Sequence, residues 1–283
     1  MTRWRPFIYS FCLFALAGKT HATSDLKPMT EEERSSVIYA ESILIPVPGE
    51  FFAALDKQGK RNWPSLMRNV PSPASPNRAQ MALNLGTLIA DGYIAVEAQD
   101  GQQVKNIGRD ILAIAKTLGV SQDVLNRGQS ITDFAENNDW SGLKEELEAT
   151  QNEVKMTMTK QKDQDLITLV NLGSWIRGMQ AASTLINQDY TPEAARLLYQ
   201  PSVANHLLKK VDLLTPRLKE DPLVQQAQET LAFTREEMCI ENGDSLSHEA
   251  IHAIENKTFE IINKISDTSA SPPSQKPSPK ATP

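Results

Sequence analysis

Cysteine is nearly absent from this 283-residue chain, which contains only Cys12 and Cys239. Cys12 lies in an N-terminal segment that we expect to be removed, so the mature chain keeps one cysteine and cannot form an intramolecular disulfide. We expect Cys239 to be a small buried residue of a helix. The sequence also contains no C-x-x-C pair, glycine-rich phosphate loop or G-x-S-x-G sequence. These absences exclude disulfide-stapled folds and several common enzyme classes.

Positive charge is scarce as well. The 29 Lys and Arg residues are outnumbered by 35 Asp and Glu residues, which gives a net charge of −6 at pH 7. No basic patch is visible along the chain. Because nucleic acids and anionic membrane surfaces attract clustered Lys and Arg, we expect no nucleic-acid partner.

Long apolar runs are lacking, apart from residues 7–18 near the N-terminus. Arg3 and Arg5 precede this run, and small residues follow it up to Ala22. A basic start, an apolar stretch of about 7–15 residues and small residues at the cleavage site are typical of a secretory signal peptide. We predict a signal peptide over residues 1–22, cleaved near Ala22, and a secreted or periplasmic, bacterial location. The run is too short to span a membrane, and we expect no transmembrane segment after cleavage.

Removal of this segment takes away three cationic residues and no acid. The mature chain then has 26 Lys and Arg against 35 Asp and Glu, a net charge of −9. Residues 268–283 are rich in Pro, Ser and Lys and contain no large apolar side chain, so we predict a disordered tail. Residues 23–267 remain as one domain.

Strand signals are missing from residues 23–267, because no segment alternates apolar and polar residues over any length. Helical spacing and helix-capping residues predict an all-α bundle of about ten helices, without significant sheet. The expected helices cover residues 31–44, 50–57, 76–98, 102–118, 121–137, 140–160, 163–187, 192–200, 202–214, 223–241 and 245–265.

Two of these segments carry the same short sequence and are expected to form the centre of the bundle. Asn-Leu-Gly-Thr occupies residues 84–87, and Asn-Leu-Gly-Ser occupies residues 171–174. The first segment is apolar on nearly all sides of a helical wheel, which is typical of a buried helix. Glycine in a helix costs about 1 kcal/mol relative to alanine. We therefore interpret the glycines of both segments as sites where helices approach closely: Gly86, Gly92, Gly173 and Gly178.

Asn84, Asp91 and Arg177 form a candidate buried polar strip on these two segments. Asp91 and Arg177 follow the two equivalent asparagines at similar distances along the chain. If the helices are neighbours, Asp91 pairs with Arg177, because a buried acid needs such a partner. Alternatively, each charge reaches solvent at a helix edge. In a third interpretation, the strip anchors a small ligand between the two helices.

His248-Glu249-x-x-His252 is the one sequence motif that indicates a catalytic site. On a helix, this spacing places both imidazoles on one face, where they could hold zinc while Glu249 acts on a bound water. The apolar stripe of the same helix lies elsewhere, so the two His are expected to face solvent. No third ligand is evident among the few acids that follow. A zinc-dependent hydrolase is therefore the alternative hypothesis, and we assign no metal or cofactor.

No other group of residues indicates a reaction. We therefore expect an exported helical protein that acts by binding, or as a structural or accessory part of the cell envelope, with a protein partner there. Small-ligand binding between the two central helices and zinc-dependent hydrolysis remain the alternatives.

Overall fold

Helices form most of the described part of the chain. The computed structural model describes residues 48–68, 75, 77–119, 122–161, 163–240 and 245–267, with the backbone alone at 122–126. These residues form about ten helices and no strand, which confirms the predicted all-α bundle. The predicted signal peptide, the helix predicted at 31–44 and the predicted tail lie outside the described residues. The elements are α2 Pro48–Asp56, the 3₁₀ helix η1 Trp63–Leu66, α3 Arg78–Glu97, α4 Gly101–Leu118, α5 Gln122–Glu136, α6 Trp140–Lys160, α7 Gln164–Gln188, α8 Pro192–Leu197, α9 Pro201–Asp212, α10 Pro216–Lys219, α11 Pro222–Glu237 and α12 His248–Ser266.

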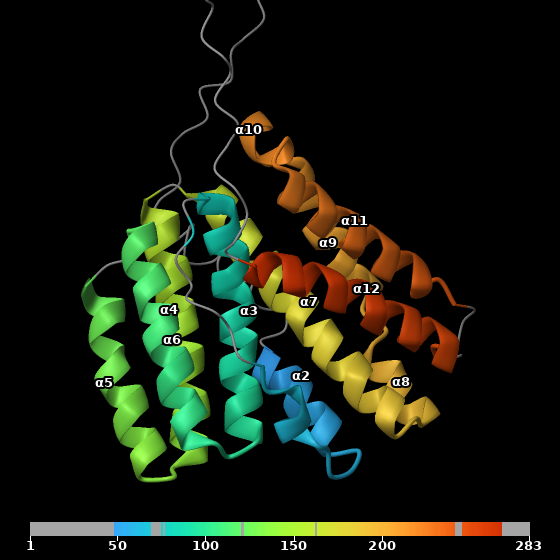
Figure 1. Cartoon of the computed structure of the whole chain (residues 1–283), viewed down its shortest axis with the longest axis horizontal. Helices are drawn as coiled ribbons and strands as arrows, with labels where there is room; N and C mark the ends of the chain where they lie inside the picture. Colours follow the sequence, from blue (N-terminus) through green and yellow to red (C-terminus); the bar gives the residue numbers. More distant parts are fainter. Residues whose placement is uncertain are drawn as a thin grey trace, which may run out of the picture.

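The two segments that share the Asn-Leu-Gly sequence become α3 and α7, and they form the most extensive helix contact in the described fold. In Figure 1, α4, α5 and α6 lie on one side of this pair, and α8, α9, α11 and α12 lie on the other. Nearly every residue of α3 and most of α7 are buried. The expectation of two buried, glycine-containing central helices is therefore confirmed.

Two of the four glycines explain how closely α3 and α7 approach. A Cβ atom placed on Gly86 would lie 2.0 Å from the carbonyl oxygen of Val170, and one placed on Gly173 would lie 2.1 Å from that of Leu83. Each glycine thus packs against the backbone three residues before the other glycine. The start of α3 lies beside the start of α7, where Arg78 Nη2 is 2.7 Å from Asp163 Oδ2, and Asp91 contacts Arg177 further along both helices. α3 and α7 therefore run in the same direction.

The other two glycines do not fit the close-packing interpretation. A Cβ on Gly92 would be in ordinary contact with Ile107, 3.8 Å away, and a Cβ on Gly178 would meet nothing within 4 Å. The sequence does not distinguish Gly86 and Gly173 from Gly92 and Gly178, because all four glycines lie in similar helical segments.

Capping chemistry defines most helix starts, with some differences from the sequence prediction. Asn77 accepts hydrogen bonds from the backbone N–H groups of Ala79 and Gln80, so α3 begins at Arg78, slightly later than expected. The proline-rich connection between α2 and α3 contains η1. Cys239 is exposed, contrary to the expectation of burial, because it follows the end of α11. Within the described residues, no helix is both long and apolar enough to cross a bilayer.

Candidate functional site

Asp91 and Arg177 of the predicted polar strip form an ion pair inside the protein. Arg177 Nε donates to Asp91 Oδ1 over 2.7 Å, and both side chains are almost completely buried. The predicted pairing is confirmed. The carboxylate has a second cation that the sequence did not indicate: Arg68 donates from Nε and Nη2 to Asp91 Oδ2, at 2.8 and 2.6 Å.

The two arginines connect this carboxylate to distant parts of the chain. Arg177 Nη2 donates to the carbonyl of Leu66 over 2.8 Å, and Arg68 Nη1 donates to Ser266 Oγ over 2.6 Å. Burial alone would raise the pKa of Asp91, but the charges of Arg177 and Arg68 outweigh it and hold the pKa below its usual value. Asp91 thus joins α3, α7, η1 and the end of α12 as an ionised carboxylate.

Asn84 completes the strip in a different way. Thr87 shares its single hydroxyl proton between the Asn84 carbonyl, 2.9 Å away, and the Asn84 side-chain oxygen, 3.1 Å away, and only 2% of Asn84 is exposed. None of Asn84, Asp91 and Arg177 lines either of the two pockets described below. Their geometry supports a structural role and gives no support to a ligand held by this strip.

The His-Glu-x-x-His sequence lies at the start of α12, with His248, Glu249 and His252 exposed. The His248 ring packs 5.3 Å from the ring of Tyr190, and His252 Nδ1 is 3.0 Å from Asn256 Nδ2. Hydrogen bonds at the helix start, from its own backbone N–H and from Ser247, lower the pKa of Glu249. A general base that works near neutral pH needs the opposite shift.

The nearest downstream acid, Glu255, is hydrogen-bonded to α7. It accepts hydrogen bonds from Thr184 Oγ1 over 2.7 Å and from Asn187 Nδ2 over 2.5 Å, both on α7. In the described part of the chain, no three His, Cys, Asp or Glu residues converge on a metal-sized space. The geometry therefore offers no support for the zinc hydrolase hypothesis.

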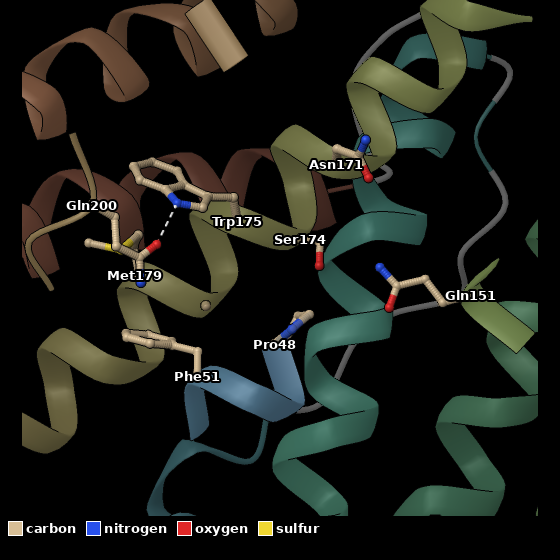
Figure 2. Close-up of a pocket in the computed structure, with 9 residues that line it drawn as sticks. Pro48, Phe51, Gln151, Asn171, Ser174, Trp175, Met179 and Gln200 are labelled. Atoms are coloured by element: carbon tan, nitrogen blue, oxygen red, sulfur yellow. Dashed lines mark hydrogen bonds between the residues drawn. The ribbon is translucent and has the colours of Figure 1, made fainter. Parts of the chain in front are cut away.

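A pocket beside α7 is the strongest candidate site, and we refer to it as the α7 pocket. It encloses about 390 Å³ of empty space, open solvent at its mouth included. Figure 2 shows Ser174 and Gln151 facing each other at one end, with Phe51, Trp175 and Gln200 at the other. The pocket is lined by Pro48, Phe51, Gln151, Asn171, Ser174, Trp175, Gly178, Met179 and Gln200.

The lining comes from four separate parts of the chain. One face of α7 supplies most of it, because residues three and four apart on a helix lie side by side. Phe51 comes from α2, Gln151 from α6 and Gln200 from the start of α9. Trp175 Nε1 donates to Gln200 Oε1 over 3.2 Å, which fixes the indole in place (Figure 2). Gly178 keeps the space beside this indole open, since its missing side chain would meet no atom.

Two buried oxygen atoms of the α7 pocket have no hydrogen-bond partner. Ser174 Oγ and Gln151 Oε1 are both shielded from solvent, and their residues are 4% and 6% exposed. A buried polar atom left unpaired costs about 1–3 kcal/mol. Such atoms are uncommon in folded proteins and call for an explanation. A bound group that hydrogen-bonds to both oxygens would remove this cost.

The chemistry of the lining favours recognition over catalysis. None of the nine lining residues carries a carboxyl, imidazole, amino, guanidino, thiol or phenol group. Ser174 has no hydrogen-bonded base that would activate its hydroxyl as a nucleophile. The pocket combines apolar and aromatic surface with carboxamide and hydroxyl groups, as ligand-binding pockets commonly do.

Part of this site carried a signal in the sequence. Asn171 and Ser174 belong to the repeated sequence that begins with Asn-Leu-Gly. Gln151 and Phe51 lie on amphipathic helices, and nothing in their spacing marks them as pocket residues.

Comparison with known proteins adds no relative. The chain matches no protein-family model, no curated protein and no solved structure. Functional inference therefore rests on the geometry of the chain itself.

Proposed function

We propose that this protein is a non-catalytic binding protein whose ligand is a small uncharged molecule held in the α7 pocket. The observation that carries the proposal is the pair of unpartnered buried oxygens, Ser174 Oγ and Gln151 Oε1. A ligand that donates two hydrogens at its inner end, such as those of an amide NH2 or of two hydroxyls, satisfies both groups, because a hydroxyl oxygen and a carboxamide oxygen both accept.

The rest of the lining narrows the class of ligand. Since none of the described residues that line the pocket is charged, an ionised ligand would lose its hydration without gaining a counter-charge from them. Phe51 and Trp175 offer flat apolar surfaces, and Asn171 and Gln200 offer further amide groups. We infer a neutral ligand with hydroxyl or amide groups at one end and an apolar or ring portion against the aromatic side chains.

The signal peptide predicted at residues 1–22 supports a protein that meets this ligand after export, in the periplasm or outside the cell. A protein partner in the cell envelope is compatible with this role and remains a prediction. The absence of acid–base groups from the pocket sets this proposal apart from a hydrolase.

Thermal-shift screening of the full chain tests the proposal. The screen uses pairs of compounds with the same skeleton, one neutral and one charged, such as glucose and glucuronate. We expect neutral hydroxyl- or amide-bearing members to raise the melting temperature, and their charged partners to have little effect. Equal responses to both members of each pair would contradict an uncharged site.

A pocket-filling variant locates the binding. In Gly178→Val, the new side chain enters the α7 pocket, and its Cβ has no neighbour within 4 Å. We expect this variant to fold and to lose the ligand-induced shift. The matched control is Gly108→Val, at another helical glycine with room for a Cβ. It should respond like the wild type. Unchanged binding in Gly178→Val would show that the ligand binds elsewhere.

A further inference from the structure

A second cavity lies on the opposite side of α3 from α7, and we refer to it as the four-helix cavity. It is enclosed by α3, α4, α5 and α6 and contains about 460 Å³ of empty space, part of it open to solvent. Its walls are almost entirely apolar, with Leu85 and Ile89 from α3 and Ile131 from α5 among them. Tyr93, Thr150 and Gln151 are the only described lining residues with polar side-chain atoms.

Two of these three polar residues carry unpartnered buried atoms. Thr150 Oγ1 donates to the carbonyl of Glu146 over 2.7 Å and is therefore satisfied. Tyr93 Oη and Gln151 Oε1 have no partner, although Tyr93 is only 2% exposed and Gln151 only 6%. The two atoms differ in their hydrogen-bonding capacity, because the phenol can donate a hydrogen bond and the carboxamide oxygen can only accept one.

A hydroxyl group on an apolar molecule matches this combination. Its oxygen can accept from Tyr93 Oη while its proton is donated to Gln151 Oε1, and the attached carbon skeleton faces the aliphatic walls. A water molecule matches less well. Buried waters typically make about three hydrogen bonds, and this lining offers a water only two unsatisfied partners.

We propose that the four-helix cavity is a second binding site, and that it takes a small apolar molecule bearing one hydroxyl group. The site shares the Gln151 side chain with the α7 pocket but differs from it in ligand class, since its lining is aliphatic and has no array of amide groups. Gly108 belongs to the wall of the four-helix cavity, and a Cβ placed there would first meet Ile131 Cγ2 at 3.8 Å. A larger residue at this position fills the cavity.

Phenol and toluene are suitable probes, because they have nearly the same shape and differ in the hydroxyl group. We expect the full chain to bind phenol about tenfold more tightly than toluene, the difference that one or two net hydrogen bonds supply. Binding can be measured by ligand-observed NMR titration. Tyr93→Phe should reduce the preference for phenol, and this variant removes only a hydroxyl without a partner, so it should fold. Gly108→Val should abolish binding of both probes.

The matched control is Gly178→Val, which fills the α7 pocket and should leave phenol binding unchanged. Equal affinities for phenol and toluene, a preference for phenol that survives in Tyr93→Phe, or normal binding in Gly108→Val would each overturn the proposal. If the cavity holds only a structural water, phenol will not bind and Tyr93→Phe will lower the melting temperature. That result also overturns the proposal. It would give Gln151 Oε1 a partner, so the α7 pocket would then depend on Ser174 Oγ, and its separate screen still tests it.

Discussion

In α3, Thr87 donates its hydroxyl proton to the carbonyl oxygen of Asn84 over 2.9 Å and is completely buried. In α7, the equivalent Ser174 keeps its hydroxyl oxygen unpartnered at the wall of a pocket. Both helices carry Asn-Leu-Gly at the same relative positions, and both use the glycine of that sequence to approach the other helix. The hydroxyl that follows the shared Asn-Leu-Gly sequence thus has a hydrogen-bond partner in α3 and lacks one in α7.

Further along, the two helices diverge in sequence as well as in surroundings. The position of α7 that corresponds to Asp91 is Gly178. Asp91 binds two arginines and ties four elements together, whereas Gly178 leaves empty space beside Trp175. At this position α3 thus carries a stabilising ion-pair network, whereas α7 lines a pocket. This division predicts opposite responses to matched substitutions in the two helices.

The largest effect is expected from Asp91→Asn. This change leaves Arg68 and Arg177 facing each other without a carboxylate, and removal of one partner from a buried ion pair costs about 3–5 kcal/mol. Denaturant unfolding at pH 7 measures the free energy of unfolding. The control is Asp163→Asn, which breaks the more exposed pair with Arg78 and should cost under about 1 kcal/mol. Similar losses in both variants would mean that Asp91 is not the central connection.

Acidification should cause part of the stability loss of Asp91→Asn in the wild-type protein. The folded-state pKa of Asp91 is depressed, so its ionised form stabilises the fold above the unfolded-state pKa of about 4. That contribution is lost as the pH falls through the lower folded-state pKa. Unfolding curves between about pH 6 and pH 2 should therefore show a smaller loss in Asp91→Asn than in the wild type. Parallel curves for the two proteins would contradict the assigned ionisation.

Helical glycines provide the next test of the comparison. Gly86→Ala drives a methyl group into the backbone of α7, so the helices must separate, which we expect to cost about 1–3 kcal/mol or more. Gly178→Ala adds the same methyl group to open space, and alanine should stabilise the helix by about 0.5–1 kcal/mol. Melting temperatures of the two variants should move in opposite directions. If both fall, the space beside Gly178 is not open.

The sequence supports prediction of α3 and α7 because local patterns determine their features. The helices were visible from apolar periodicity, and the Asp91–Arg177 pair from the similar spacing of both residues after the two Asn-Leu-Gly sequences. Arg68 was missed as a second partner of Asp91, because it follows η1 in a proline-rich connection without periodicity. Its position depends on how that connection folds back across α3.

Most of the residues that line the α7 pocket could not be predicted from the sequence, for a similar reason. Whether a hydroxyl such as that of Ser174 is satisfied depends on which side chains three other helices bring near it. Gln151 and Phe51 lie on ordinary amphipathic helices, and their inward positions follow from packing and not from residue spacing. Gly178 resembled Gly173 in the sequence, and only the arrangement of neighbouring helices distinguishes the open glycine from the closely packed one.

The smallest expected effect compares the two equivalent hydroxyl groups directly. Thr87→Val removes the hydroxyl that bonds to the Asn84 carbonyl, and we expect a loss of about 1 kcal/mol. Ser174→Ala removes a hydroxyl that has no partner, so the stability of the ligand-free protein should stay constant or rise slightly. The same Ser174→Ala variant should bind the ligand of the α7 pocket more weakly, while Thr87→Val binds it normally. A loss of stability in Ser174→Ala equal to that in Thr87→Val would mean that its oxygen is already satisfied, by a bound water for example, and the contrast between the two helices would then disappear.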